Sequence, residues 1–197
     1  MFPPGQSGRV DGVAIGQLDK SLGSATLPVA FRNNTAHGIA HVDLTSTARL
    51  ASGKVVGSGS SQDVVPAQIP VGGIGLAYIY FESAKAIPTH GTRYAFNSDA
   101  SPADTSSYNT APVKITQANH VGGAIVGTGI NATGKKLTGP YAVDAFCFIN
   151  GSELARVESD FANEDGDLRP GATISFSIDL YGDACSRYLV GSSGFFV

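Results

Sequence analysis

The sequence predicts an all-β protein built from two tandem β-sandwich domains, and three observations lead to this fold class. Segments in which apolar and polar residues alternate recur along the chain between turns rich in Gly, Pro, Asn and Ser. Charged residues are only 15% of the 197 residues, beside 25 Gly and 10 Pro, a composition that favours short strands over long helices. The chain also contains the same order of segments twice, so each half is expected to fold as its own domain.

Three short motifs carry this internal repeat. They are Asn33-Asn34-Thr35 with Asn131-Ala132-Thr133, Pro70 with Pro170, and Thr92-Arg93-Tyr94 with Ser186-Arg187-Tyr188. The copies are separated by 98, 100 and 94 positions, so only short insertions distinguish them. A repeat of this length predicts two similar domains rather than a solenoid of short units.

The expected strands follow one another in the same order in both halves. In the first half they cover residues 10–15, 27–32, 40–50, 54–58, 74–81 and 93–97, and in the second half 113–116, 124–130, 141–149, 153–161, 173–180 and 187–191. The turn pairs Ser52-Gly53 and Asn150-Gly151 separate the third strand of each half from the fourth. Short strands at this spacing are typical of a sandwich.

The penultimate strand of each half has the clearest core pattern. In the second half Ile174, Phe176, Ile178 and Leu180 alternate with polar residues, which predicts one buried and one solvated face. The first half repeats the pattern as Ile74, Leu76, Tyr78 and Tyr80, which we expect to face its core. Its other face, with Ile79 and Phe81, is apolar too. That face needs cover, so Ile79 and Phe81 are candidate binding residues.

The domain boundary is expected in a polar stretch between the halves. Residues 98–111 are rich in Ser, Asp and Pro and cannot form a core, which predicts a linker between a first domain of residues 1–97 and a second of residues 112–197. The net charge is −3 and the 13 Lys and Arg are scattered, which argues against nucleic acid as a partner. No apolar run is long enough to span a membrane. The start of the chain lacks the features of a signal peptide, so export would require an upstream leader or lipid anchor that is absent from this sequence.

The second half resembles the FxLYD type of immunoglobulin-like domain found in bacterial envelope proteins. The residues that carry the resemblance are Asn131-Ala132-Thr133, the segment Phe146-Cys147-Phe148-Ile149-Asn150-Gly151, and Pro170-Gly171 before Phe176. In the first half the aromatic strand end is replaced by Thr47-Ala48-Arg49-Leu50, so the similarity there rests on the internal repeat. The resemblance implies a module of a lipoprotein or secreted protein, usually without enzymatic activity.

The only two cysteines, Cys147 and Cys185, both lie in the second half, and the aligned stretches of the first half have neither. A pair that is absent together is explained more simply by a disulfide than by two independent thiols, although two unpaired thiols remain the alternative. A disulfide implies an oxidising compartment, which predicts an extracytoplasmic location, either secreted or in the cell envelope.

Two further groups of polar residues have a functional and a structural interpretation. Asp160, Asn163, Asp165 and Asp167 offer hard oxygen ligands of the kind that calcium takes, or form a solvated acidic turn. Asn33, Asn131 and Asn150 each begin an Asn-x-Ser/Thr triplet, which marks either a glycosylation acceptor or a turn residue.

No motif for a catalytic nucleophile or a phosphate-binding loop is present, so a non-enzymatic role without a cofactor is expected, calcium being the one candidate. The leading hypothesis is an interaction or structural module of a bacterial envelope protein that presents loops and edge strands to a protein partner. One alternative is a carbohydrate-binding module that recognises a cell-wall component or another glycan through exposed tyrosines such as Tyr108. The other is a self-associating subunit of a coat or appendage.

The disulfide is open to a direct test. Mass measurement of the unreduced protein, with and without alkylation, is expected to show no thiol that reacts before reduction. Two alkylated cysteines in protein purified from an oxidising compartment would contradict the pairing.

Overall fold

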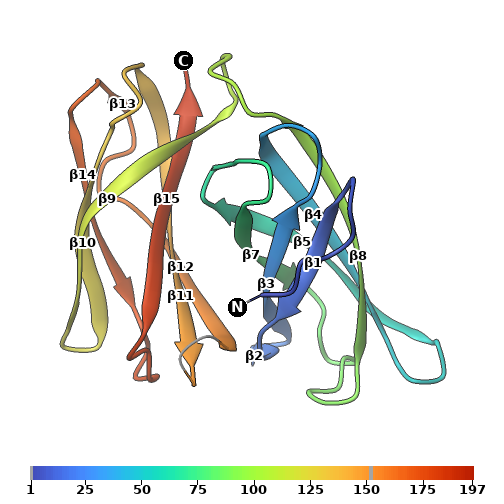
Figure 1. Cartoon of the computed structure of the whole chain (residues 1–197). Coiled ribbons are helices and arrows are strands. Elements are labelled where there is room, and N and C mark those ends of the chain that lie inside the picture. Colours follow the sequence, from blue (N-terminus) through green and yellow to red (C-terminus); the bar gives the residue numbers. More distant parts are fainter. Residues whose placement is uncertain (1, 151–152) are drawn as a thin grey trace.

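The computed structural model of the chain describes residues 2–150 and 153–197, which form strands and no helix (Figure 1). The all-β prediction is therefore confirmed, and no helix of the described residues is long and apolar enough to span a membrane. Asn150 of the expected Asn-Gly turn has a φ of 48°, the left-handed conformation that asparagine tolerates, whereas Gly151 lies outside the described residues.

The first half of the chain forms a mixed-length antiparallel sheet that curls around its own core. Its strands are β1 (Val10–Ile15), β2 (Asp19–Ser21), β3 (Ser24–Asn33), β4 (Ile39–Arg49), β5 (Val55–Val65), β6 (Gln68–Ile69), β7 (Ile74–Phe81) and β8 (Arg93–Pro102). The paired order is β1-β3-β7-β5-β4, with β2 on β3 and with β6 and β8 on β4.

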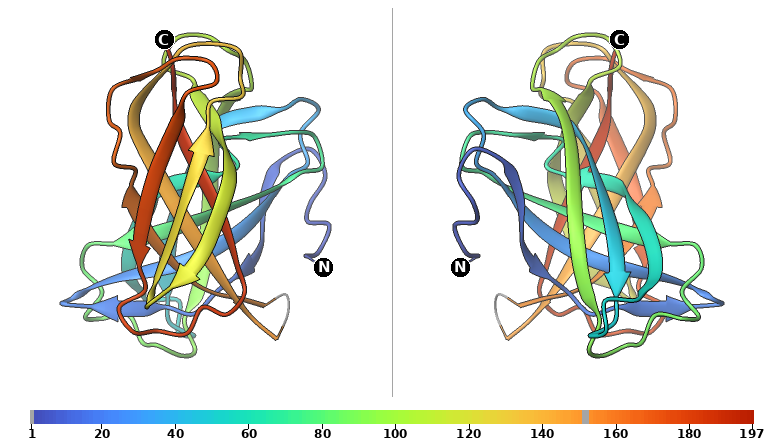
Figure 2. Two further views of the ribbon diagram at one scale, coloured as in Figure 1. Left: turned by 90° about the vertical axis from the view of Figure 1, so that its left-hand side faces the viewer. Right: turned by 90° about the vertical axis from the view of Figure 1, so that its right-hand side faces the viewer.

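The second half forms a second curled sheet beside the first (Figure 1), and each turned view in Figure 2 looks at one half with the other behind it. Its strands are β9 (Thr110–Val121), β10 (Ala124–Ile130), β11 (Leu137–Ile149), β12 (Glu153–Phe161), β13 (Asp167–Leu168), β14 (Thr173–Asp179) and β15 (Tyr188–Phe196). The paired order is β12-β11-β15-β9-β10-β14, with β13 on β11.

The two halves have the same cyclic order of strands. If β1-β3-β7-β5-β4-β8 is read as a ring and each strand is replaced by its counterpart in the repeat, the ring becomes β9-β10-β14-β12-β11-β15, the order found in the second half. The rings differ only in where they are open: the first between β8 and β1, and the second between β14 and β12. The repeated sequence pattern therefore corresponds to a repeated topology.

The Asn-x-Thr motifs explain how each half fixes the loop after its second major strand. The buried amide of Asn33 donates to the carbonyl oxygens of His37 and Ile69, and that of Asn131 donates to those of Lys135 and Leu168, at 2.8 to 3.0 Å. The hydroxyl of the threonine two residues later donates to the asparagine side chain in both copies. Because Asn33 and Asn131 are buried and fully engaged, they are structural turn residues and not glycosylation acceptors in the folded protein.

Each half encloses an apolar cluster, and β7 is oriented opposite to the prediction. Ala77, Ile79 and Phe81 point into the core of the first half, beside Leu27 and Phe31. Ile74, Leu76 and Tyr78 lie on the outer face instead, and Tyr80 is 39% exposed. The periodicity alone could not decide, because both faces of β7 are apolar.

The outer face of β7 is covered by the second half of the chain. A third apolar cluster joins Ala30, Val65 and Leu76 of the first half to Phe146, Leu154 and Val157 of the second, and all six are buried. The backbone amide of Gln17 also donates to the carbonyl oxygen of Ala155, at 2.9 Å. The two halves thus share a core of their own between the two sheets.

The connection between the halves is shorter than the predicted linker. β8 continues to Pro102 and pairs with β4 along that length, and β9 begins at Thr110, so residues 98–102 of the expected linker belong to the first sheet. The remaining segment is held locally, because Asp104 accepts hydrogen bonds from Ser106 and from the Asn109 amide. Thr110 further ties the connection to Ala67 and His41 of the first half.

Gly191 on β15 provides a test of the contact between the halves. A Cβ atom at Gly191 would overlap the Val65 side chain, including its Cβ atom at 2.9 Å, so Gly191→Ala should push β15 and β5 apart. We expect the free energy of unfolding to fall by about 1 to 3 kcal/mol, as measured by urea denaturation. Gly166→Ala is the matched control, because a Cβ there meets no atom within 4 Å.

The same contact can be checked by a double-mutant cycle. Val65→Ala in the Gly191→Ala background removes the overlapping methyl groups and should cost less than Val65→Ala alone. Additive losses would show that the two residues do not meet in solution.

Candidate functional site

The two cysteines form a disulfide, as the sequence predicts. Cys147 on β11 and Cys185 after β14 are bonded, with their Cα atoms 5.3 Å apart, and the bond is buried in the second core. It attaches the loop between β14 and β15 to the C-terminal part of β11. A structural disulfide is typical of an oxidising environment.

The proposed calcium ligands are not gathered into a site. Asp167 pairs with Lys136 at 2.9 Å, and the amide of Asn163 donates to Ser175. The carboxylate of Asp160 accepts from the backbone of Phe161. Within residues 2–150 and 153–197, no group of three or more His, Cys, Asp or Glu side chains is arranged to hold a metal ion. The structure therefore favours the solvated acidic turn.

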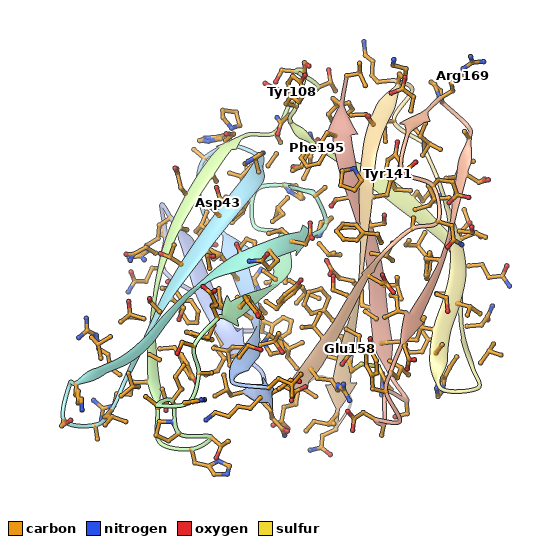
Figure 3. The ribbon with its side chains drawn as sticks, turned by 180° about the vertical axis from the view of Figure 1, so that it is seen from behind. Asp43, Tyr108, Tyr141, Glu158, Arg169 and Phe195 are labelled. Atoms are coloured by element: carbon orange, nitrogen blue, oxygen red, sulfur yellow. A yellow bond between two sulfur atoms is a disulfide. The ribbon has the colours of Figure 1, made fainter. Side chains whose placement is uncertain are left out.

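The predicted binding residues lie in different environments. Ile79 and Phe81 are fully buried in the first core, so they do not form a binding surface, contrary to the prediction. Tyr108 is 78% exposed in the connection between the halves, near Phe195 in Figure 3. Its backbone amide donates to the carbonyl oxygen of Phe196 at 2.8 Å, which fixes the main chain at this position.

The strongest candidate site is a groove between the two halves, and sequence reasoning did not find it. The groove has a volume of about 530 Å³. The first half contributes residues of β2, β3 and β7 to its walls, and the second half contributes β12 and the loop after β14. We call it the interdomain groove. Three tyrosines line it, Tyr78, Tyr80 and Tyr181, and the last is 79% exposed.

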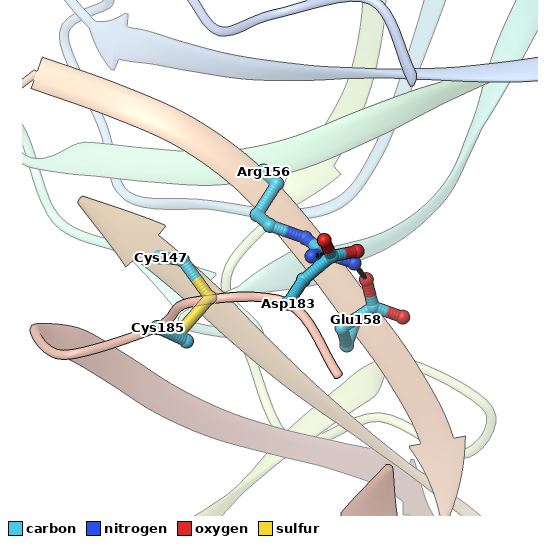
Figure 4. The surroundings of a disulfide bond; sticks show 5 residues. All are labelled: Cys147, Arg156, Glu158, Asp183 and Cys185. Carbon is cyan, nitrogen blue, oxygen red and sulfur yellow. Dashed lines mark hydrogen bonds and ion pairs between the residues drawn. A yellow bond between two sulfur atoms is a disulfide. The ribbon is translucent and has the colours of Figure 1, made fainter. Parts of the chain in front are cut away.

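Arg156 on β12 organises the charged side of the interdomain groove. Its guanidinium group forms ion pairs with Glu158 on the same strand and with Asp183 in the loop after β14 (Figure 4). Arg156 and Glu158 are only 15% and 14% exposed, so this ion pair is partly shielded from water. Burial raises the pKa of Glu158 above its usual value, and the hydrogen bond and charge of Arg156 oppose that shift.

The disulfide positions one wall of the groove. Cys185 lies two residues after Asp183 and four after Tyr181, and the bond to Cys147 anchors this loop beside β11 (Figure 4). Within the loop, the amide of Tyr181 donates to Asp179 at 2.6 Å and that of Asp183 to Leu180 at 2.9 Å. The loop is therefore fixed both covalently and by its own hydrogen bonds.

A second polar group lies inside the interface, where two carboxylates from different halves approach each other. Asp144 on β11 is 1% exposed, and one of its carboxylate oxygens has no hydrogen-bond partner. Burial and the charge of Asp63 raise the pKa of Asp144 to about 7, although the Ser159 hydroxyl lowers it in part. Burial raises the pKa of Asp63 to about 6, opposed by the hydroxyl of Ser193 at 3.4 Å.

The sequence contains a weak indication of the interdomain groove and of the buried carboxylate pair. Asp144 is the one charged residue in the apolar segment 141–149, and Tyr80 is the second-last residue of a strand that is apolar on both faces. Their partners, however, come from the other half of the chain. Only the packing of the halves brings Asp63 to Asp144 and β7 to Arg156.

A comparison of the sequence with protein-family models and with curated proteins found no match.

The buried carboxylate of Asp144 should make the stability of the protein depend on pH. Because the pKa of Asp144 is raised in the folded state, its contribution to stability is fully present below the unfolded value of about 3.8 and is lost as the pH rises to about 7. Asp144→Asn should remove this loss and raise the free energy of unfolding at pH 8 by about 1 to 3 kcal/mol, because the side chain at position 144 then carries no charge.

The measurement is the difference in unfolding free energy between variant and wild type from pH 4 to pH 8. Taking the difference cancels the pH-dependent contributions of Asp104 and Asp167, which are the same in both proteins. Their pKa values are lowered, so these contributions change with pH in the opposite direction. Asp165→Asn, at an exposed position, is the control. A difference for Asp144→Asn that does not change with pH would contradict the assignment.

Proposed function

We propose that the chain is a non-enzymatic interaction module of a bacterial envelope protein. In this proposal two immunoglobulin-like sandwiches, packed into one scaffold, present an edge strand to a protein partner. The Asn-x-Thr motifs, the aromatic strand end before Asn150 and the Pro-Gly turn support the immunoglobulin-like assignment through the resemblance noted above. The disulfide supports an extracytoplasmic location, because such bonds persist in oxidising compartments.

The observation that carries the proposal is the open seam between β1 and β8. In the second half the equivalent strands β9 and β15 are joined by backbone pairing from Thr110 to Val113. In the first half, which is described throughout residues 2–102, β1 and β8 have no such pairing. They meet through the Ser98 hydroxyl, 3.4 Å from the carbonyl oxygen of Val10, and through the Phe96 ring, which faces Gly12.

An unpaired strand of this length is suited to strand addition. β8 spans ten residues and pairs on one side only, with β4. An extended segment of another protein can satisfy the remaining backbone groups while the exposed side chains along β8 set the specificity. A cavity of about 90 Å³ lies in the seam and is lined in part by Val29, Phe31 and Leu44, which would offer apolar contact to an incoming side chain.

Asn97→Lys tests this proposal. Asn97 is exposed in the middle of β8, and a lysine at an edge disfavours the addition of another strand. We expect binding to detergent-solubilised envelope proteins of the producing bacterium to weaken at least fivefold, as measured by surface plasmon resonance with the immobilised chain.

The matched control is Thr45→Lys. Thr45 is exposed on β4 directly opposite Asn97, so it adds the same charge one strand away from the edge. Equal weakening by both substitutions, or no saturable binding by the wild type, would count against an edge-strand module.

A further inference from the structure

We propose that the interdomain groove is a binding site for a neutral saccharide. This inference goes beyond the edge-strand function, because it uses none of residues 93–102 and names a different class of ligand. The groove volume of about 530 Å³ lies in the range of roughly 300 to 1,000 Å³ that is usual for small-molecule sites. Both halves contribute walls, so a ligand in the groove contacts the two sheets at once.

Tyrosine side chains from both halves line the groove. Tyr80 on β7 and Tyr181 after β14 approach the groove from opposite halves, and Tyr78 lies deeper between them. Tyrosine rings present a large flat apolar face with a polar tip, and they lose little conformational entropy on binding. Such faces suit the C–H surface of a sugar ring, and the phenol groups suit its hydroxyls.

The charged groups of the groove are held in place by contacts within the protein. Arg156 holds the carboxylates of Glu158 and Asp183 in place, and the disulfide holds the loop that carries Asp183. Planar charged groups make strong hydrogen bonds with defined directions. Thr26 adds a hydroxyl that can both donate and accept. A polyhydroxylated ligand can use all of these groups together.

The charge of the groove favours a neutral ligand over an anion or a cation. The lining has two basic side chains, Lys20 and Arg156, and three acidic ones, Asp19, Glu158 and Asp183. This slight negative excess disfavours an anion. A cationic peptide is also disfavoured, because two of the three carboxylates are already paired with Arg156. A neutral ligand gains the hydrogen bonds of the groove without displacing these pairs.

The test uses the full chain and a panel of neutral oligosaccharides: β-1,4-linked glucose, α-1,4-linked glucose and β-1,4-linked N-acetylglucosamine oligomers. An oligogalacturonate and an oligolysine peptide serve as anionic and cationic comparisons. Binding is followed by calorimetry and by intrinsic fluorescence, which reports tyrosines because the chain has seven Tyr and no Trp. We expect saturable binding of at least one neutral oligomer and a loss of affinity of at least tenfold in Tyr181→Ala.

Tyr108→Ala is a closely matched control. Tyr108 is 78% exposed against 79% for Tyr181, and both have a left-handed backbone, with φ values of 65° and 52°. Only Tyr181 lines the groove, so Tyr108→Ala should leave the affinity unchanged and Tyr80→Ala should weaken it. Thermal unfolding of each variant confirms that it is folded.

Three outcomes would overturn the proposal: no saturable binding by any neutral oligomer, equal effects of Tyr181→Ala and Tyr108→Ala, or Tyr181-dependent binding of the cationic or anionic comparison alone. Asn97→Lys should bind the saccharide as the wild type does, so failure of the groove and failure of the β8 edge are distinguishable.

Discussion

The packing of the two halves against each other is the contact on which the other features depend. Leu76 on one side and Phe146 on the other are buried in a cluster that belongs to neither core. Burying a large apolar side chain contributes about 1.5 to 3 kcal/mol, so a few such residues are a substantial share of the stability of small domains. This cluster also fixes the distance between β7 and β12. The walls of the interdomain groove come from both strands, and they stand opposite each other only because the cluster holds the sheets together.

Some residues at this contact add little attraction between the halves. They instead restrict how the two sheets can pack. Gly16 lies where a Cβ would come within 2.7 Å of the Ala155 carbonyl oxygen, so a larger residue there would separate the halves. Asp144 places a carboxylate among apolar side chains at a cost in stability. Buried polar groups of this kind often select one arrangement among several that apolar packing alone would allow. The interface thus combines a general attraction with local constraints on its geometry.

The sequence predicted the strands, the repeat and the disulfide, because these depend on local alternation, on order along the chain and on cysteine count. It did not predict which face of β7 is internal, because Ile74 to Phe81 is apolar on both faces and the choice is made by the second half. It also missed the groove, since Tyr80 and Arg156 are far apart in sequence. Asp160 and Asp167 suggested calcium by spacing alone, whereas in the structure Asp167 is paired with Lys136.

The dependence of the first half on the second has a consequence for biosynthesis. Translation proceeds from the N-terminus, so all residues of the first sandwich are synthesised before the residues of β11 and β12 that bury its outer face. At roughly 5 to 20 residues per second, the outer face of β7 waits several seconds before Phe146 emerges, and longer before Cys147 is oxidised. A nascent chain with Leu76 and Ile74 uncovered is prone to aggregate and is a natural client for a holding chaperone. The order in which the halves are synthesised therefore makes the packing of Phe146, Leu154 and Val157 onto β7 the step that ends this vulnerable period.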